Sequence, residues 1–369
     1  MRIWNQIPCA MSIHFQKLEV KEVRRETPEC VSVLFRVPDE IKKDFLYKQG
    51  QSLTMRTFLG GEEVRRTYSI CASPLDNEWR VAIKKQEGGL FSNFANETLK
   101  PGDFLEVMEP VGKFYTELQP GNKKTYVAFA AGSGITPVIS IIKTTLRIEP
   151  QSQFTLVYGN KNKNSIIFKE ELEALKDKFI DRFRIIHILS RERTDAPINS
   201  GRIDLNKLNG LSKLIRYKNV DEFFICGPEE MIFCVKEFLE SNGIDKKKIH
   251  FELFTTPGEV KGTRTKEQVT RRQEGPKSKI SVKLDGISFD FELGVNDEPI
   301  LDAALKQGAD LPFACKGGVC CTCKAKLIQG KVDMEVHWGL EEEEIEQGYI
   351  LTCQSHPKTE TVAVDFDIK

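Results

Sequence analysis

The sequence predicts three consecutive domains: an all-β domain over residues 12–118, a doubly wound α/β domain over 119–256, and a small α+β domain over 279–369. The chain has 369 residues, more than the ~250–300 that one hydrophobic core normally serves. Near Gly121 the pattern changes from short alternating runs to alternating strand-like and helix-like segments. Residues 257–278 are polar, basic and bounded by Pro-Gly and Gly-Pro pairs, which is typical of a linker.

Short alternating apolar runs separated by Pro, Gly and Asp predict antiparallel strands in the first domain. In the second domain, strands alternate with amphipathic helices, so we expect a parallel sheet covered on both faces. The third domain begins with two strands and a helix. The predicted strands are 30–37, 52–58, 79–84, 104–108, 125–131, 154–158, 183–189, 221–226, 249–254, 280–284 and 288–293, and the helices are 90–98, 137–147, 167–178, 229–239 and 299–308.

Charge is unevenly distributed along the chain. Its 54 basic and 54 acidic residues balance, but residues 279–369 contain nine Lys against 17 Asp and Glu, a net charge of −8. An acidic domain on a basic body suggests either internal docking or a charged partner surface. The net charge of zero for the whole chain favours neither nucleic acid nor a membrane as partner.

No apolar run reaches the ~18 residues of a membrane span. The first residues lack the apolar core of a secretory signal, and Met11 is an alternative start to Met1. We therefore expect a cytoplasmic protein, in which the ten cysteines do not form a disulfide framework.

Four cysteines carry the strongest motif in the chain. Cys315, Cys320 and Cys323 have the spacing C-x4-C-x2-C, and Cys353 follows after 29 intervening residues. This is the plant-type spacing for a 2Fe–2S cluster, in which one loop supplies three thiolates and a distant segment supplies the fourth. A structural zinc site is the alternative, but it requires paired C-x2-C knuckles and only one is present.

Two short motifs in the all-β domain are suited to a flavin. Arg66-Thr67-Tyr68-Ser69 ends a strand, where an Arg can pair with a phosphate and a Tyr can stack on a ring. Gly88-Gly89 precedes the short helix, whose backbone N–H groups can hold a pyrophosphate. Alone, the first motif is equally compatible with an ordinary strand.

Gly132-Ser133-Gly134-Ile135-Thr136-Pro137 joins a predicted strand to a helix, the context of a dinucleotide-binding turn. The third glycine of the usual fingerprint is missing. Cys226-Gly227-Pro228 occupies an equivalent strand–helix junction, where ligands bind in such folds, although a buried core cysteine is the alternative. Ser190 and Arg191 follow another strand and favour NADPH over NADH, because a bidentate Arg suits a 2′-phosphate, and a plain polar loop is the alternative.

These motifs, in this order, resemble the ferredoxin–NADP⁺ reductase superfamily, and more narrowly the oxygenase reductases that end in a plant-type ferredoxin domain. The resemblance covers nearly the whole chain from about Ile13. It implies a flavin-binding β-barrel, a nucleotide-binding α/β domain and a β-grasp-type ferredoxin domain. It further implies that electrons pass from NAD(P)H through FAD and the cluster to an oxygenase component.

The resemblance also implies roles for individual residues, with Tyr68, Ser69 and Cys226 at the catalytic centre. It places Glu252 and Phe254 beside the flavin and Cys321 away from the cluster, where the family has a small residue. The cofactor-binding residues it implies are Arg66, Tyr68, Ser69, Ile83, Lys84, Gly89, Ser92, Gly112 and Phe114 for FAD, and Gly134, Thr136, Gly159, Asn160, Ser190, Arg191 and Gly227 for the nicotinamide nucleotide.

Among these reductases the likeness is greatest to those of phenylacetyl-CoA epoxidases, so we expect that diiron oxygenase as the acceptor. A reductase of another oxygenase or of a hybrid-cluster protein is the second interpretation. A non-catalytic redox sensor that binds flavin and a cluster is the third. The acidic run 341–346 is suited to docking a basic acceptor, but such runs are usually solvated faces.

Overall fold

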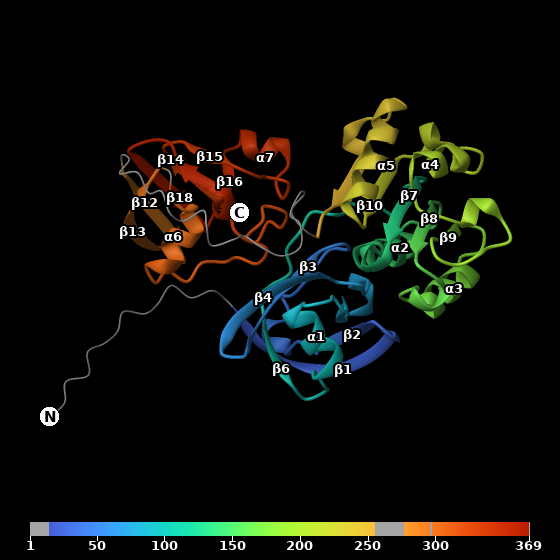
Figure 1. Ribbon diagram of the computed structural model, residues 1–369, viewed down its shortest axis with the longest axis horizontal. Helices are drawn as coiled ribbons and strands as arrows, with labels where there is room; N and C mark the ends of the chain where they lie inside the picture. The colour runs from blue at the N-terminus through green and yellow to red at the C-terminus, as the bar shows by residue number, and fades with distance from the viewer. Residues whose placement is uncertain (1–14, 255–276, 296, 369) are drawn as a thin grey trace. The chain divides into compact units, whose positions relative to one another are not determined.

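The computed structural model describes residues 15–254, 277–295 and 297–368 (Figure 1). These form two compact units, one over Gln16–Leu253 and one that holds residues 277–368. The first unit contains two sheets, which correspond to the predicted all-β and α/β domains. Met1, Met11 and the predicted linker lie outside the described residues, except for the last two linker positions, which begin a strand.

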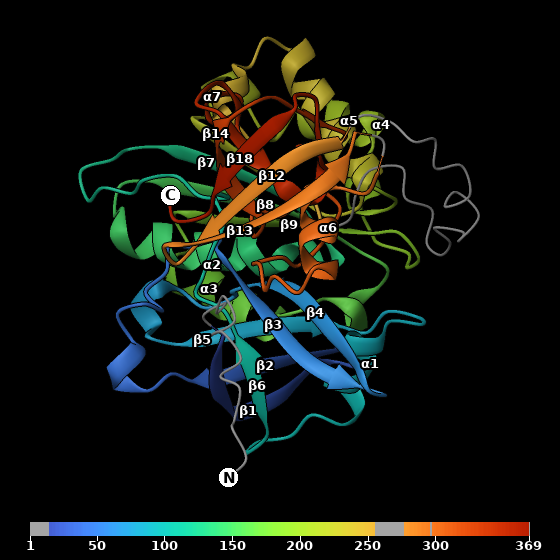
Figure 2. The ribbon, with the colours of Figure 1, turned by 90° about the vertical axis from the view of Figure 1, so that its left-hand side faces the viewer.

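The first sheet is antiparallel, with the strand order β4-β3-β6-β1-β2-β5. An isolated bridge between Ile70 and Val81 joins the two ends of this order, and so closes the sheet into a barrel. Figure 2 shows β3 and β4 side by side. Phe91 and Ala95 of the single helix α1 are buried in the barrel core. The elements are β1 Gln16–Thr27, β2 Cys30–Arg36, β3 Ser52–Leu59, β4 Glu62–Ser69, β5 Trp79–Lys84, α1 Leu90–Glu97 and β6 Phe104–Val107.

The second sheet is parallel, with the order β11-β10-β7-β8-β9. The chain winds outward from β7 in both directions, so the strand order reverses between β7 and β10, the usual position of a ligand site in such sheets. Helices lie on both faces (Figure 1). The elements are β7 Thr125–Ala131, α2 Ile135–Ile148, β8 Gln153–Asn160, α3 Lys169–Lys178, β9 Phe183–Leu189, α4 Leu205–Leu211, β10 Glu222–Cys226, α5 Glu229–Ser241 and β11 Ile249–Glu252.

Helix α2 joins the parallel sheet to the barrel. It is buried almost all round because it packs on the sheet on one side and on the barrel on the other. Ser140 Oγ donates to the carbonyl of Ala72 over 2.6 Å, and the Thr144 and Ser73 hydroxyls are 2.8 Å apart. These contacts explain why the barrel and the α/β domain form one compact unit.

The second unit is a mixed sheet in the order β13-β12-β18-β14-β16, with β12 and β18 parallel and the other neighbours antiparallel. Helix α6 packs its Ile300 and Leu301 into the core of this sheet. This is the β-grasp-type arrangement that the resemblance implied. The elements are β12 Lys277–Leu284, β13 Ile287–Gly294, α6 Ile300–Lys306, β14 Lys324–Gln329, β15 Val332–Met334, α7 Glu342–Glu346, β16 Tyr349–Leu351, β17 Ser355–Pro357 and β18 Thr361–Asp365.

The structure differs from the expectations in several details, among them β1, β14 to β18 and α7, which were not predicted. Strand β11 ends at Glu252, so Phe254 lies beyond it. The helix α4 was not predicted, because its seven residues include Asn and Gly. The acidic run is not wholly solvated, because Glu344 is buried and its carboxylate lies 3.1 Å from Lys324 Nζ.

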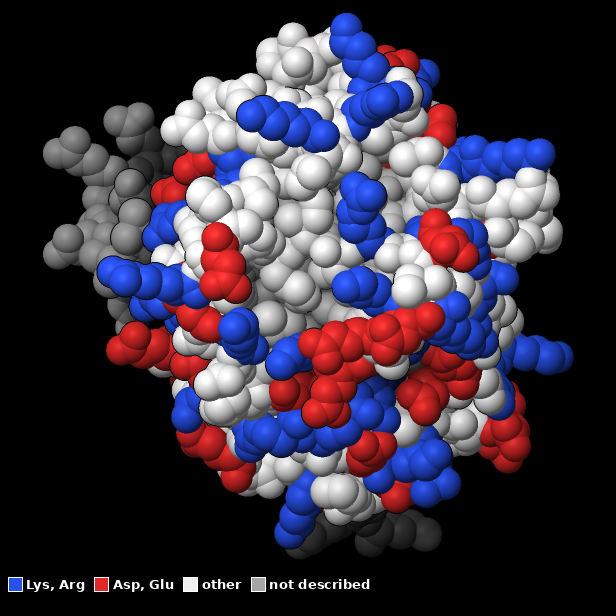
Figure 3. All heavy atoms as spheres, turned by 90° about the vertical axis from the view of Figure 1, so that its right-hand side faces the viewer, with Lys and Arg blue, Asp and Glu red and all other residues white. Residues whose placement is uncertain are grey.

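Surface charge is mixed where it can be seen. On the face shown in Figure 3, basic and acidic side chains lie side by side, with an acidic band across its middle. No helix in the part of the chain that the structure describes is long and apolar enough to cross a membrane.

Candidate functional site

The end of strand β4 presents the predicted flavin residues. Arg66 is exposed. Within the described residues its guanidinium has no carboxylate partner, and its one hydrogen bond goes to the carbonyl of Arg65 over 2.6 Å. Tyr68 is half-buried with its ring centroid 5.6 Å from that of Phe91, and burial raises the pKa of its phenol. An unneutralised Arg beside a fixed aromatic ring fits a phosphate-bearing ring system.

The turn before α1 leaves its backbone open. Gly88 has φ +70°, and a Cβ built there would meet no atom within 4 Å. Gly89 caps α1 without any side-chain hydrogen bond to its first N–H groups, as a pyrophosphate site requires. Ser92 Oγ accepts from the N–H of Gln86 over 3.1 Å and donates to the Gly89 carbonyl over 3.2 Å. Its side chain therefore fixes the shape of the turn.

Strand β5 contributes Ile83 and Lys84 in different ways. Ile83 is fully buried in the barrel core. Lys84 is half-buried, and its Nζ lies 3.7 Å from the point where a Cβ on Gly132 would stand. Lys84 therefore reaches from the barrel to the predicted nucleotide turn of the α/β domain.

That turn, Gly132-Ser133-Gly134, lies where the strand order reverses. Gly134 faces the end of β10, and a Cβ there would stand 2.0 Å from the Cys226 carbonyl oxygen. Two hydroxyls hold the turn: Thr136 Oγ1 donates to Ser133 over 3.0 Å, and the buried Tyr158 hydroxyl donates to Gly132 over 3.0 Å. Only glycine allows this close approach, which leaves the start of α2 open to a nucleotide.

Cys226, Glu252 and Ser69 lie together at the junction of the two sheets. Cys226 pairs in register with Glu252, and Ser69 Oγ is 3.1 Å from Glu252 Oε2. Burial raises the pKa of Glu252 to about 7, against the lowering effect of the Ser69 hydrogen bond. Burial, and then the Glu252 charge, raise the pKa of Cys226 well above its usual value, so its thiol stays protonated.

The remaining predicted nucleotide residues follow neighbouring strands. The N–H of Ser190 donates to the carbonyl of Asn160 over 2.9 Å, which places Ser190 and Arg191 at the carboxyl end of β8 and β9. Both residues are exposed. Gly227 packs against Ala131, and Phe254 is 43% exposed. Thus one connected group contains Tyr68, Ser69, Gly134, Cys226 and Glu252. The other two nucleotide residues, Ser190 and Arg191, lie further along the sheet edge.

In the second unit, the four predicted ligands form two thiol pairs. Cys320 lowers the pKa of Cys315 to about 6, and Cys323 lowers the pKa of Cys353. Two pairs of thiols fit a centre of two irons with two thiolates each, and the pairs are complete without the partly exposed Cys321.

The cluster loop is shaped by backbone contacts. Cys315 Sγ accepts from the N–H groups of Gly317 and Cys320 over 3.3 and 3.4 Å, the kind of bond that tunes a reduction potential. Gly318 has φ +71°, and a Cβ there would stand 2.7 Å from the carbonyl oxygen of Val336. Buried Gln354 donates to the Lys316 carbonyl over 2.9 Å.

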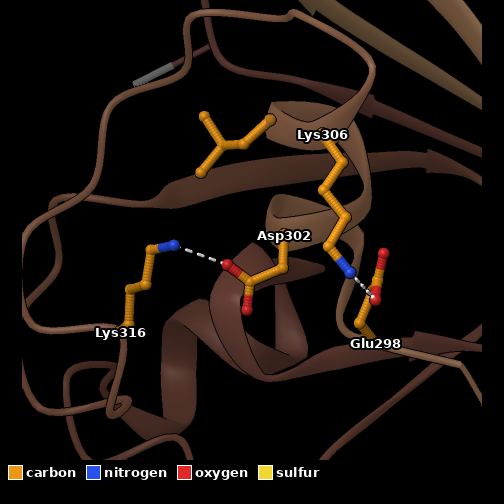
Figure 4. Close-up of a pocket in the computed structure, with 5 residues that line it drawn as sticks. Glu298, Asp302, Lys306 and Lys316 are labelled. Carbon is orange, nitrogen blue, oxygen red and sulfur yellow. Dashed lines mark hydrogen bonds and ion pairs between the residues drawn. The ribbon is translucent and has the colours of Figure 1, made fainter.

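Helix α6 also supports this loop (Figure 4). Lys316 has φ +52°, and its Nζ lies 2.6 Å from Asp302 Oδ1 and 4.5 Å from the Phe313 ring centroid. The two charged groups line an open pocket of about 350 Å³, with Glu298, Leu305 and Lys306. A second pocket of about 360 Å³ lies at the amino end of the parallel strands, and neither pocket includes a predicted cofactor residue.

The sequence interpretation missed Tyr158, Gln354 and Asp302. Tyr158 lies in strand β8 directly before Gly159, and Gln354 follows Cys353, so proximity to the motifs was a usable signal. Asp302 lies 14 positions from Lys316 on another element, so no local pattern indicated their contact.

Three family models match the chain in succession. An oxidoreductase FAD-binding domain matches residues 17–115, an oxidoreductase NAD-binding domain 129–237, and a 2Fe-2S iron-sulfur cluster binding domain 282–358. The chain is also 46% identical to a subunit of the 1,2-phenylacetyl-CoA epoxidase of Escherichia coli (strain K12), over 96% of this chain and 98% of that one. The chain belongs to the oxygenase reductases of the ferredoxin–NADP⁺ reductase superfamily.

Other members of this oxygenase reductase family are similar over most of their length. Identity is 32% to the ferredoxin reductase component of the 3-ketosteroid-9-alpha-monooxygenase of Rhodococcus rhodochrous, over 95% of this chain and 96% of that one. It is 31% to the glycine betaine monooxygenase reductase subunit of Pseudomonas aeruginosa (strain UCBPP-PA14), over 86% and 87%. The predicted FAD, nicotinamide nucleotide and 2Fe–2S domains are confirmed, and the chain is an electron-transfer oxidoreductase.

Solved structures share the fold. Phthalate dioxygenase reductase matches with a TM-score of 0.57 and 22% identity, over 96% of this chain and 98% of that one. An intact type IV self-sufficient cytochrome P450 monooxygenase matches with a TM-score of 0.67 and 20% identity, over 95% of this chain and 41% of that one. The predicted order of three folds is thereby confirmed.

Proposed function

We propose that this oxygenase reductase passes electrons from NADPH to the oxygenase component of a phenylacetyl-CoA epoxidase. The observation that carries the proposal is the 46% identity to a phenylacetyl-CoA epoxidase subunit, against 32% and 31% for the steroid and glycine betaine systems. When bound, FAD would supply the conversion of a two-electron hydride donor into the single-electron steps that a 2Fe–2S centre requires. The thiolates of that centre need a reducing compartment, which supports a cytoplasmic location.

The residues contribute binding and orientation. Arg66 and the open N–H groups after Gly88 hold the flavin phosphates, and Tyr68 lies against its ring. Gly134 and Thr136 admit the nicotinamide nucleotide, and Arg191 with Ser190 binds the 2′-phosphate. The protonated thiol of Cys226 and the Ser69–Glu252 pair border the site of the reacting rings and exclude water from it, and burial favours a proton on Glu252 against the effect of the Ser69 hydrogen bond.

The cluster cysteines provide the first test. The Cys323→Ser variant should lose the visible and electron paramagnetic resonance signals of the cluster and all coupled epoxide formation. It should keep NADPH-dependent ferricyanide reduction, because the flavin lies in the other unit. Cys321→Ser is the matched control and should keep the cluster. Loss of the cluster in Cys321→Ser, or its retention in Cys323→Ser, contradicts the ligand assignment.

The acceptor is tested by reconstitution. The full chain, NADPH, phenylacetyl-CoA and the purified oxygenase component should consume NADPH and form the epoxide in step. If the steroid or glycine betaine oxygenase couples better, the chain is the reductase of another oxygenase. If the chain reduces no acceptor at all, including cytochrome c and ferricyanide, a redox sensor is the correct interpretation.

A further inference from the structure

An exposed aromatic side chain stands beside the cluster loop. Trp338 is 45% exposed, and it is the one aromatic among the large exposed hydrophobic residues of the second unit within 277–368. It lies in the loop between β15 and α7. Large exposed aromatic side chains are enriched as anchors of protein–protein interfaces.

The loop that carries Trp338 packs backbone to backbone on the cluster loop. The N–H of Gly339 donates to the carbonyl of Gly318 over 2.9 Å. A Cβ on Gly339 would stand 2.7 Å from the carbonyl oxygen of Cys320. At the other end, the N–H of Glu335 donates to Gln354, the neighbour of Cys353, over 3.0 Å. The indole is therefore held at the surface by a segment fixed to the neighbours of both thiol pairs.

The chain segment that carries Trp338 is strongly acidic. Residues 332–348 contain seven Asp and Glu and no Lys or Arg. Glu344 faces inward, where its carboxylate accepts from the N–H of Glu341 and pairs with Lys324 Nζ. The side chains of Glu341, Glu342 and Glu343 are exposed. Three exposed carboxylates therefore follow the apolar anchor within five positions of the chain, and a partner that covers both must be basic there.

We propose that Trp338 is the anchor by which this chain docks on its oxygenase component. The partner presents an apolar socket for the indole, with Lys and Arg side chains around it that face Glu342 and Glu343. Docking in this way places the acceptor against the backbone of Cys320. The inference rests on the proposed function, because it assigns the surface to an oxygenase component.

The test compares Trp338→Ala and Trp338→Phe with Ile328→Ala in the reconstituted full chain. Ile328 is the control because it is 55% exposed on β14 of the same unit. We expect Trp338→Ala to weaken binding of the oxygenase component tenfold or more, Trp338→Phe less, and Ile328→Ala less than twofold. NADPH reduction of the cluster and of ferricyanide should not change. Equal effects at positions 338 and 328 overturn the proposal.

Charge supplies an independent readout. The double variant Glu342→Gln and Glu343→Gln should slow association severalfold at low salt and flatten its dependence on ionic strength. If Trp338→Ala instead slows reduction of the cluster by NADPH, the surface serves transfer within the chain and the proposal is wrong. If the wild type couples to a different oxygenase, the epoxidase assignment fails while the tenfold loss is still expected with that acceptor.

Discussion

Ser69 Oγ lies 3.1 Å from Glu252 Oε2, although 183 positions separate the two residues. The contact connects the last residue of barrel strand β4 to the last residue of strand β11. Cys226, in register with Glu252, completes the group. The barrel and the parallel sheet therefore meet through one hydroxyl and one carboxyl at the site where hydride transfer is proposed.

The Glu252 carboxyl predicts a pH-dependent stability. Burial raises its pKa in the folded chain to about 7, above the usual value of 4.5. The folded state then binds more protons than the unfolded state between these values, so stability falls as the pH rises from about 4.5 to 7. Glu252→Gln should therefore stabilise the chain at pH 8 by roughly 1–3 kcal/mol relative to its effect at pH 4. Urea unfolding at the two pH values measures the difference.

Glu222 on the adjacent strand β10 is the control of opposite sign. Although burial raises the pKa of Glu222, hydrogen bonds from His250 and Lys124 lower it overall. Glu222→Gln should therefore lower the free energy of unfolding, relative to the unsubstituted chain, more at pH 8 than at low pH. Parallel pH effects in the two variants would contradict the assignment to individual carboxyl groups.

The sequence predicted the parts whose signal is local. The cysteine spacing, the glycine turns and the alternation of strands and helices each lie within a short window, and they located the cluster loop, the turn at Gly134 and the order of the folds. Contacts such as Ser69–Glu252 and Asp302–Lys316 join distant elements, and their partners follow from packing that no local pattern encodes. Phe254 was placed in a strand because apolar spacing continues past Glu252, where pairing has already ended.

Gly134 predicts a steric effect on the nucleotide turn. A Cβ there would stand 2.0 Å from the backbone oxygen of Cys226, which cannot rotate away. Gly134→Ala should therefore lower the free energy of unfolding by about 2–3 kcal/mol and weaken NADPH binding. Gly121→Ala is the matched control, since a Cβ there meets nothing within 4 Å, and should change stability by less than about 0.5 kcal/mol. Equal effects would mean that the β10 end moves away from the turn without loss of stability.

The position of Arg191 predicts a preference for NADPH over NADH. Its exposed side chain at the carboxyl edge of the sheet is expected to bind the 2′-phosphate, and charge-assisted hydrogen bonds of this kind contribute about 1.5–3 kcal/mol. Arg191→Ala should raise the KM for NADPH roughly tenfold or more and leave that for NADH unchanged. Arg216→Ala removes an exposed charge at the opposite edge and should change neither. An unchanged KM for NADPH in Arg191→Ala would remove the argument for NADPH.

The Asp302–Lys316 pair predicts a shift in the potential of the cluster. Lys316 follows Cys315 directly, and Asp302 neutralises its charge over 2.6 Å. Reduction adds negative charge to the cluster, so an uncompensated Lys316 should favour the reduced form. Asp302→Asn should raise the midpoint potential by roughly 20–40 mV, since a partly screened charge contributes about 0.5–1 kcal/mol in a one-electron step. Lys316→Gln should lower it.

Glu298→Gln, which breaks the more exposed pair with Lys306 in the same pocket, should have little effect. A spectroelectrochemical titration distinguishes these outcomes, and equal shifts in Asp302→Asn and Glu298→Gln would show a general effect of surface charge rather than the specific pair.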